Sequence, residues 1–316
     1  MGNVGGSYLD EAWVVIESWC KRLASAKGSA GLVPQWLAVS EGLRPAMDDW
    51  VLRSKLDEVS RIASERGLHV LPDVAFRRIG SIEGVRGAAR LTTTVTTGIW
   101  WTEADNRDRV HVFVGSDQAR AREAARWGWY PVVVGLDVVS ADPADARAFG
   151  LALGYPACCV EAFLANNRWD GLGHFHRLPA AEQRPSLLNF LGRHHGWSWL
   201  FHIPCGWTCE ASMQLARATR AAMAGMDLEW VSWADGLACG RFVVISELSC
   251  YRLDPTTFLG VGGADRWSAA LEGGKVGVDA RGRVVIEEGA GALPFSTRSV
   301  GHAAEHAMLW TFCKES

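Results

Sequence analysis

The sequence contains no run of 18 apolar residues, so no segment is predicted to span a bilayer. It also lacks an excess of either charge: 32 basic and 35 acidic residues leave a formal net charge of -3. This balance excludes a broad surface for nucleic acid or anionic lipid. The first residues lack the basic head and apolar stretch of a secretory signal. We therefore expect a cytoplasmic protein.

Signatures of several enzyme classes are missing as well. No Gly-x-Ser-x-Gly elbow supports a serine hydrolase, and Gly260-Val-Gly-Gly263 fits neither the dinucleotide fingerprint nor a Walker A loop. Lysine and tyrosine are scarce, with 5 and 4 copies, whereas there are 27 arginines and 16 tryptophans. The arginine, alanine and glycine content is typical of a bacterial genome rich in G and C. The tryptophan surplus fits heavily buried cores or a pocket walled by indoles.

The composition, 48% hydrophobic and 21% charged over 316 residues, is typical of a globular protein. We predict an α/β or α+β fold, a mixed sheet with helices and a cysteine-bearing helical segment in the middle. Residues 1–138 form an N-terminal α/β region in this interpretation. A helical site region rich in Cys, His and Trp follows at 139–225, and a C-terminal α+β region at 226–316. The three regions could also form one continuous domain.

Hydrophobic periodicity places the individual elements. In the first half it predicts helices at 8–26, 46–66 and 117–127, and strands at 90–102, 110–114 and 130–137. The order strand, helix, strand favours a βαβ unit there. In the second half it predicts helices at 141–153, 156–166, 208–223 and 301–312, a short helix near 186–195, strands at 227–233, 241–246 and 249–258, and a hairpin at 275–286.

Four of the eight cysteines fall in two short motifs. The first is Gly154-Tyr-Pro-Ala-Cys158-Cys159, and the second is His202-Ile-Pro-Cys205-Gly-Trp-Thr-Cys209. If a helix includes Cys205, then Cys205 and Cys209 lie one turn apart, about 5–6 Å between their Cβ atoms. If the helix begins near Thr208, Cys205 precedes it and Cys209 lies in its first turn, where the helix dipole favours a thiolate. Both alternatives favour ligation of a metal.

The kind of metal stays open between two main possibilities. Adjacent side chains point about 100° apart on a helix, so a single small ion suits only one of Cys158 and Cys159, whereas a larger cluster suits both. Cys158, Cys159, Cys205 and Cys209 therefore favour an iron-sulfur cluster, most simply a 4Fe-4S cluster. Zinc is the alternative, with His202 as a fourth ligand beside three of the thiols. Burial of inert thiols in the core is the remaining interpretation.

Two further metal patterns are weaker. The spacing of Cys205 and Cys209 partly matches the radical-SAM signature, but Ser212 stands where that signature needs a third cysteine. His302-Ala-Ala-Glu305-His306 matches the H-x-x-E-H arrangement of inverted zinc peptidases. Glu315 is the only acid downstream that could complete that ligand set.

Acid-base candidates surround the cysteines. His202, Glu161 and Glu210 are the candidate catalytic residues, because each lies within a few residues of a cysteine that is a candidate ligand. For both carboxylates, a solvated helix face is the competing interpretation. A further group of imidazoles is a candidate for substrate binding or proton transfer: His174, His176, His194 and His195. The Trp-rich and His-rich segment 169–207 is predicted to line the pocket.

The two cysteine motifs resemble a family of prokaryotic proteins classified as a domain of unknown function. The resemblance covers residues 150–215 and depends on Gly-Tyr-Pro-x-Cys-Cys with Phe163 four residues on, and on His-x-Pro-Cys-x3-Cys with Ser212 three residues on. It implies that Cys158, Cys159, Cys205, Cys209 and His202 are the positions that match the family pattern. It implies no activity.

These observations together predict an iron-sulfur enzyme, a lyase, dehydratase or sulfur-transfer enzyme acting on a small molecule. In this hypothesis three cysteines hold the cluster and the fourth lies near the cluster or the substrate. The alternative is a zinc-binding protein with a structural or hydrolytic Cys/His site. Neither needs nucleic acid or membrane as a partner.

Overall fold

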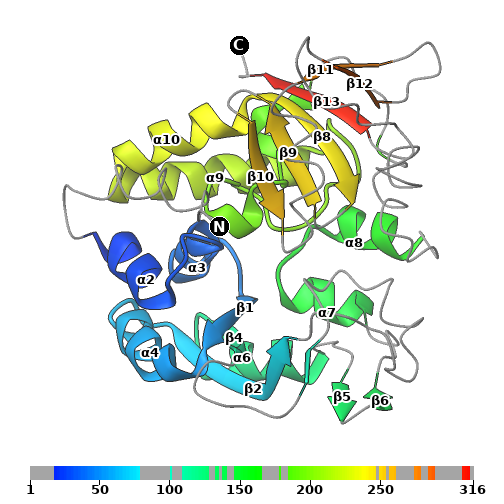
Figure 1. Cartoon of the computed structure of the whole chain (residues 1–316). Helices are drawn as coiled ribbons and strands as arrows, with labels where there is room; N and C mark the ends of the chain where they lie inside the picture. Colours follow the sequence, from blue (N-terminus) through cyan, green and yellow to red (C-terminus); the bar gives the residue numbers. More distant parts are fainter. Residues whose placement is uncertain are drawn as a thin grey trace.

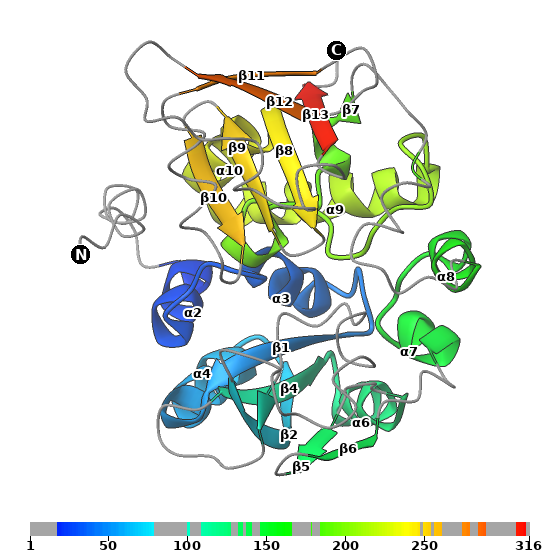
Figure 2. The same ribbon diagram turned by 45° about the vertical axis from the view of Figure 1, so that its right-hand side comes forward.

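The computed structural model describes residues 18–78, 100–101, 109–127, 132–134, 137–140, 146–165, 178, 184–246, 249–253, 256–260, 274–278, 284–288 and 308–313. Helices and mixed sheets make up an α+β fold, as predicted (Figure 1). Figure 2 shows two main sheets, one in each half of the view, with helices between them.

The first sheet is antiparallel and has the order β1-β4-β2-β3. Its strands are β1 (Ala46–Leu52), β2 (His69–Arg78), β3 (Trp100–Trp101) and β4 (Arg109–Gly115). One face packs on the helices α2 (Trp19–Lys27), α3 (Val33–Ser40) and α4 (Leu56–Ser64). The other face carries Phe113 against α6 (Gln118–Trp127) and α7 (Ala146–Ala152). Side chains alternate between the faces of a strand, so β1 is covered on both sides.

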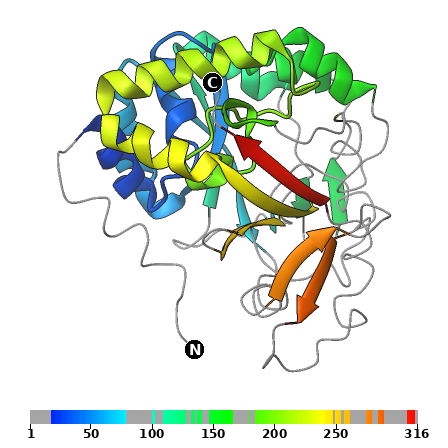
Figure 3. The same ribbon diagram turned by 90° about the horizontal axis from the view of Figure 1, so that it is seen from above.

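The second sheet has the order β10-β9-β8-β13-β7. Its described strands are β7 (Arg184–Pro185), β8 (Gly240–Ser246), β9 (Ser249–Leu253), β10 (Thr256–Gly260) and β13 (Met308–Cys313). Among these strands only β13 and β7 pair in parallel, and the other neighbours pair antiparallel. The helices α9 (Glu210–Met226) and α10 (Leu228–Ala238) lie side by side next to this sheet (Figure 3). Two hairpins form separate sheets: β5 (Val132–Val134) with β6 (Asp137–Ser140), and β11 (Gly274–Val278) with β12 (Val284–Glu288).

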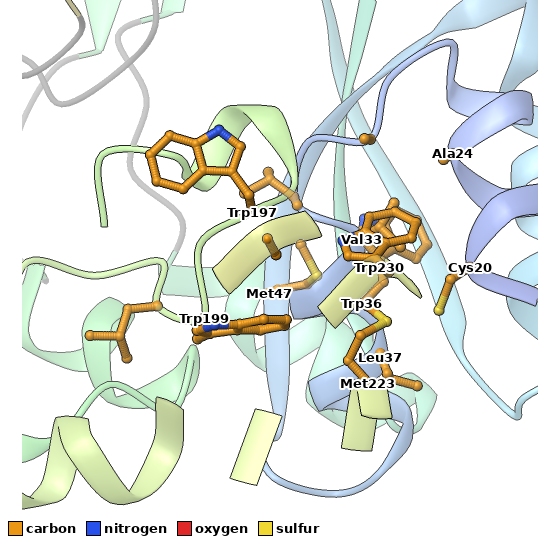
Figure 4. Close-up of a cluster of buried hydrophobic side chains, with 14 of the residues drawn as sticks. Cys20, Ala24, Val33, Trp36, Leu37, Met47, Trp197, Trp199, Met223 and Trp230 are labelled. Atoms are coloured by element: carbon orange, nitrogen blue, oxygen red, sulfur yellow. The ribbon is translucent and has the colours of Figure 1, made fainter. Parts of the chain in front are cut away.

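A single buried cluster runs from Trp19 in α2 to Phe312 in β13 and joins both sheets. Trp36, Trp197 and Trp199 are among its largest fully buried side chains (Figure 4). Buried indoles keep their donors satisfied, as where Trp230 Nε1 donates to the Gly196 carbonyl over 2.8 Å. The prediction that segment 169–207 lines a pocket is wrong for Trp197, Trp199 and Trp207, which pack in this core.

In two segments the structure has a strand where a helix was predicted, or a helix where a strand was predicted. The predicted helix 46–66 is a strand over 46–52 and a helix only from Leu56, because seven residues of β1 pair with β4. The predicted strand 227–233 belongs to α10. Asp227 caps this helix by accepting a hydrogen bond from the Trp230 N–H over 3.0 Å. Capping and tertiary pairing outweigh local propensity at both places.

Two other predictions fail for topological reasons. The predicted helix 301–312 is a strand over 308–313, inserted between β8 and β7, and residues 301–307 lie outside the described residues. Of the predicted strand 130–137, the structure describes Val132–Val134, which form β5, and Asp137, which begins β6; the two strands pair antiparallel in a sheet separate from β4. The βαβ interpretation is therefore wrong.

The turn before α8 (Ala157–Leu164) is fixed by close packing. Gly154 has φ +76°, and a Cβ there would lie 2.5 Å from Pro45 Cδ, so the site needs glycine. The buried Arg44 guanidinium donates twice to the Leu153 carbonyl, over 2.9 and 2.8 Å, and once to Gln35 Oε1 over 2.7 Å. These contacts attach the α7–α8 turn to the N-terminal part of the core.

Candidate metal centre

The four cysteines of the two motifs meet at one place. Cys158 and Cys159 lie in the first turn of α8, which follows Pro156 at the N-cap position. Cys205 lies in the loop before α9, and Cys209 is the N-cap residue of that helix. Their four Sγ atoms all lie within 4.8 Å of one another. The structure thus brings together two segments about fifty residues apart, and the group could hold a metal ion.

Individual sulfur distances are short. Cys209 Sγ lies 3.7 Å from Cys158 Sγ and 3.6 Å from Cys159 Sγ, and the two adjacent sulfurs are 3.9 Å apart. The prediction that a single small ion suits only one of Cys158 and Cys159 is therefore wrong: their places at the start of α8 let both sulfurs reach one point. Of the two alternatives for the second motif, the one with Cys205 before the helix is confirmed, but the helix begins at Glu210, so Cys209 is its N-cap residue and does not lie in its first turn.

Cys159 is held by hydrogen bonds as well as by burial. Its sulfur accepts from the Cys205 N–H at 3.3 Å and lies 3.2 Å from Ser212 Oγ. Ser212 Oγ in turn lies 2.8 Å from His202 Nε2. His202 thus contacts Ser212 and is not part of the four-sulfur group, so the predicted zinc set with His202 as the fourth ligand is not the observed arrangement. If Cys159 is a thiolate, the Ser212 hydroxyl must donate to it and accept from His202 Nε2–H.

Burial and hydrogen bonding shift the pKa values of Cys159, Cys205 and Cys209 in different directions. Burial raises the pKa of Cys205 to about 11, and it also raises the pKa of Cys159. Burial acts in the same direction on Cys209, but hydrogen bonds from Ser212 and the neighbouring thiols outweigh it and lower the pKa of Cys209 to about 7. Burial, with a smaller contribution from Arg44, lowers the pKa of His202 to about 3, so this imidazole is neutral at neutral pH.

The two carboxylates predicted as catalytic lie on the surface. Glu161 is half-exposed and pairs with Arg147, and Glu210 is exposed and pairs with Arg217 at 3.8 Å. Gln214 also donates to Glu210 over 3.2 Å. These contacts match the competing interpretation of a solvated helix face.

Three residues near the centre were not predicted as functional: Ser212, Tyr155 and Arg44. The Tyr155 ring centroid lies 5.2 Å from that of His202, and the Arg44 guanidinium lies 5.2 Å from the Tyr155 ring centroid. Burial raises the pKa of Tyr155 and lowers that of Arg44. Tyr155 and Ser212 stand beside the cysteines in the motifs and could have been noticed there, but no local signal points to Arg44.

Several predicted candidates cannot be placed. His174, His176, His302, Glu305 and His306 lie outside the described residues, and so does the side chain of His194. Burial lowers the pKa of His195 to about 4, which favours its neutral form.

Among the described residues, no helix is long and apolar enough to cross a membrane.

Comparison with protein-family models, curated proteins and solved structures finds no match to this chain. The resemblance of residues 150–215 to a prokaryotic family therefore stays a prediction. What the chain can do must be argued from the cysteine group itself.

Proposed function

We propose that this chain is a metalloprotein whose Cys158, Cys159, Cys205 and Cys209 bind one metal ion, with zinc as the first candidate. The sulfur spacing supports this. A tetrahedral ion bound at about 2.3 Å by four thiolates places them about 3.8 Å apart. The three separations among Cys158, Cys159 and Cys209, 3.6, 3.7 and 3.9 Å, agree with that edge length, and Cys205 Sγ lies within 4.8 Å of each of these sulfurs.

Charge supports a cation at the same point. Four thiolates within 4.8 Å of one another would repel strongly in a partly buried site, so the group needs a positive ion to be ionised together. Thiolates are soft ligands that suit zinc and ferrous iron and are poor ligands for magnesium or calcium.

The ion would anchor α8 to the core. Of the eight residues of α8, only Cys159 and Val160 are buried, so apolar burial contributes little to its position. A bound ion would join this helix to the start of α9, whose buried side chains belong to the main core. We therefore assign the metal first a structural role at this junction.

An iron-sulfur enzyme acting on a small molecule, a lyase, dehydratase or sulfur-transfer enzyme, is the second candidate. One observation favours it: Cys158 and Cys205 are exposed, so one side of the group faces solvent. A multi-iron cluster holds its ligating sulfurs further apart than a single ion does, because the irons lie between them. This candidate therefore needs the exposed sulfurs to move outward.

Quantification of zinc, iron and acid-labile sulfide in anaerobically purified protein tests both candidates. One zinc or iron per chain without sulfide supports the single-ion centre. Several irons with equimolar sulfide and a brown colour support the cluster. Protein that binds neither metal after reconstitution contradicts both.

A further inference from the structure

The four sulfurs form two unlike pairs. Cys159 and Cys209 are buried, with 3% and 8% of their surface exposed, and we call them the inner pair. Cys158 and Cys205 are exposed, and we call them the outer pair. A structural zinc site has all four positions taken by protein ligands, whereas a reactive site keeps one position for an external ligand. Exposure of Cys158 and Cys205 makes their two positions on the ion accessible to such a ligand.

The inner pair is fixed by elements that belong to the core. Cys159 Sγ is contacted by the Cys205 N–H and by Ser212 Oγ, and Ser212 has no exposed surface. Cys209 is the N-cap of the 17-residue α9, and its carbonyl accepts from the Met213 N–H over 2.9 Å. Moving the Cys159 sulfur would break its contacts with Ser212 Oγ and the Cys205 N–H, and moving the Cys209 sulfur would break its buried contact with Cys159 Sγ at 3.6 Å.

The outer pair has more freedom. Cys158 lies on the solvent side of α8, and Cys205 lies in an irregular loop between Ile203 and Cys209. A rotamer change at either residue can carry its sulfur into solvent without opening a buried cavity. The inner and outer ligands therefore differ in how much a displacement disturbs the fold.

Resting on the proposed function, we infer that the outer pair is exchangeable and that a small external thiol replaces Cys158 or Cys205 as a ligand of the ion. The incoming thiol gives its proton to the departing cysteine thiolate, so the number of thiolates on the ion and the net charge are unchanged. A thiol is the expected ligand because it preserves the soft donor set. The exposed surface beside Cys158 carries charges of both signs, Glu161 and Arg147, and selects neither an anionic nor a cationic thiol.

Cobalt(II) substitution of the full-length protein tests this inference. Cys158→Ser and Cys205→Ser should each retain cobalt after gel filtration, and 2-mercaptoethanol should shift their sulfur-to-cobalt charge-transfer band towards that of the wild type. Cys159→Ser and Cys209→Ser should lose the ion, and 2-mercaptoethanol should not restore it. Loss of cobalt from all four variants alike, or no spectral response to the thiol, would overturn the inference.

A second measurement does not depend on variants that fold. Iodoacetamide should alkylate Cys158 and Cys205 of the metal-loaded wild type before Cys159 and Cys209, as read by peptide mass spectrometry. Alkylation of the inner pair first, or at equal rates, contradicts the inference. Wild-type protein that binds no metal at all would instead contradict the proposed function.

Discussion

Two polar sites in this molecule balance their charges in different ways. Lys27 and Asp49 form a buried ion pair, and Asp49 also accepts from Trp36 Nε1 at 2.7 Å and from the Trp50 N–H at 2.7 Å. Lys27 further donates to the Gly31 carbonyl over 2.7 Å. This site contains both signs of charge and needs nothing from outside the chain. The four-cysteine group contains like groups only, so its ionised form needs a cation. Complete internal pairing indicates a structural site, and a surplus of like ligands indicates a binding site.

Removing half of the buried ion pair should have the largest effect. Asp49→Asn leaves the Lys27 ammonium without its counter-ion and should lower the free energy of unfolding by about 3–5 kcal/mol. Urea unfolding measures this. Lys55→Ala, which removes one partner of the exposed Lys55–Glu58 pair, should cost less than about 1 kcal/mol. Equal losses of unfolding free energy in the two variants would show that the buried Lys27–Asp49 pair contributes no more to stability than the exposed Lys55–Glu58 pair.

Removal of the proposed metal ion is the matching experiment at the cysteine group. An ion present at 100 times its dissociation constant stabilises the fold by about 3 kcal/mol, so a chelator should lower the thermal midpoint. Hydrogen exchange should increase mainly in α8, because only two of its eight residues are buried and both of them adjoin or belong to the cysteine group. An unchanged midpoint after proven metal loss would contradict an anchoring role.

Acid should also destabilise the protein through His202. The unfolded imidazole binds a proton near pH 6.5, whereas the folded pKa is about 3, so protons favour unfolding. This contribution to stability is complete above pH 6.5 and falls by about 1 kcal/mol per pH unit between there and about pH 3. Unfolding free energies at pH 7 and 5 measure the slope. The slope should decrease in His202→Asn, and an equal slope in that variant would assign the acid effect to other groups.

Ser212 tests whether the inner pair depends on its hydrogen bonds. Ser212→Ala removes the hydroxyl next to Cys159 and leaves the buried His202 Nε2 without that partner, which should cost about 1–3 kcal/mol. Ser64→Ala is a control, because the exposed Ser64 hydroxyl donates only locally, to the Arg61 carbonyl over 2.7 Å. If the two alanine variants unfold at the same urea concentration, the Ser212 bridge contributes nothing to stability.

The smallest effect is expected at the surface carboxylate. Glu161→Gln breaks only an exposed pair with Arg147 and should change stability by less than about 1 kcal/mol. Its metal content should equal that of the wild type. A loss of metal in this variant would show that Glu161 contributes to the metal centre, which would support the functional role predicted from the sequence.

The predictions that succeeded depend on strong local patterns. The cysteine motifs, the helix at 118–127 and the hairpin of β11 and β12 all follow from spacing within a short segment. The start of α9 after Cys205 also agrees with one of the two alternatives considered. Local motifs therefore singled out the four cysteines, and the fold brings the two motifs together.

The predictions that failed depend on contacts between distant segments. Residues 46–52 have apolar positions that suit either period, and their strand is selected by β4, some sixty residues later. In the sequence Ser212 has a place in the second motif but no assigned role, because its partners Cys159 and His202 are revealed by the fold alone. Arg44 is one more surface-type residue in the sequence, yet it is buried against Leu153.

The turn at Gly154 also bears on how the chain matures. During synthesis from the N-terminus, Arg44 can dock the Leu153 carbonyl and present Cys158 and Cys159 while the second motif is still unmade, since Cys205 follows Cys159 by 46 residues. At that stage an ion meets two thiolates at most. All four sulfurs are together only when the start of α9 docks, so loading of the proposed ion would mark a nascent chain as correctly assembled.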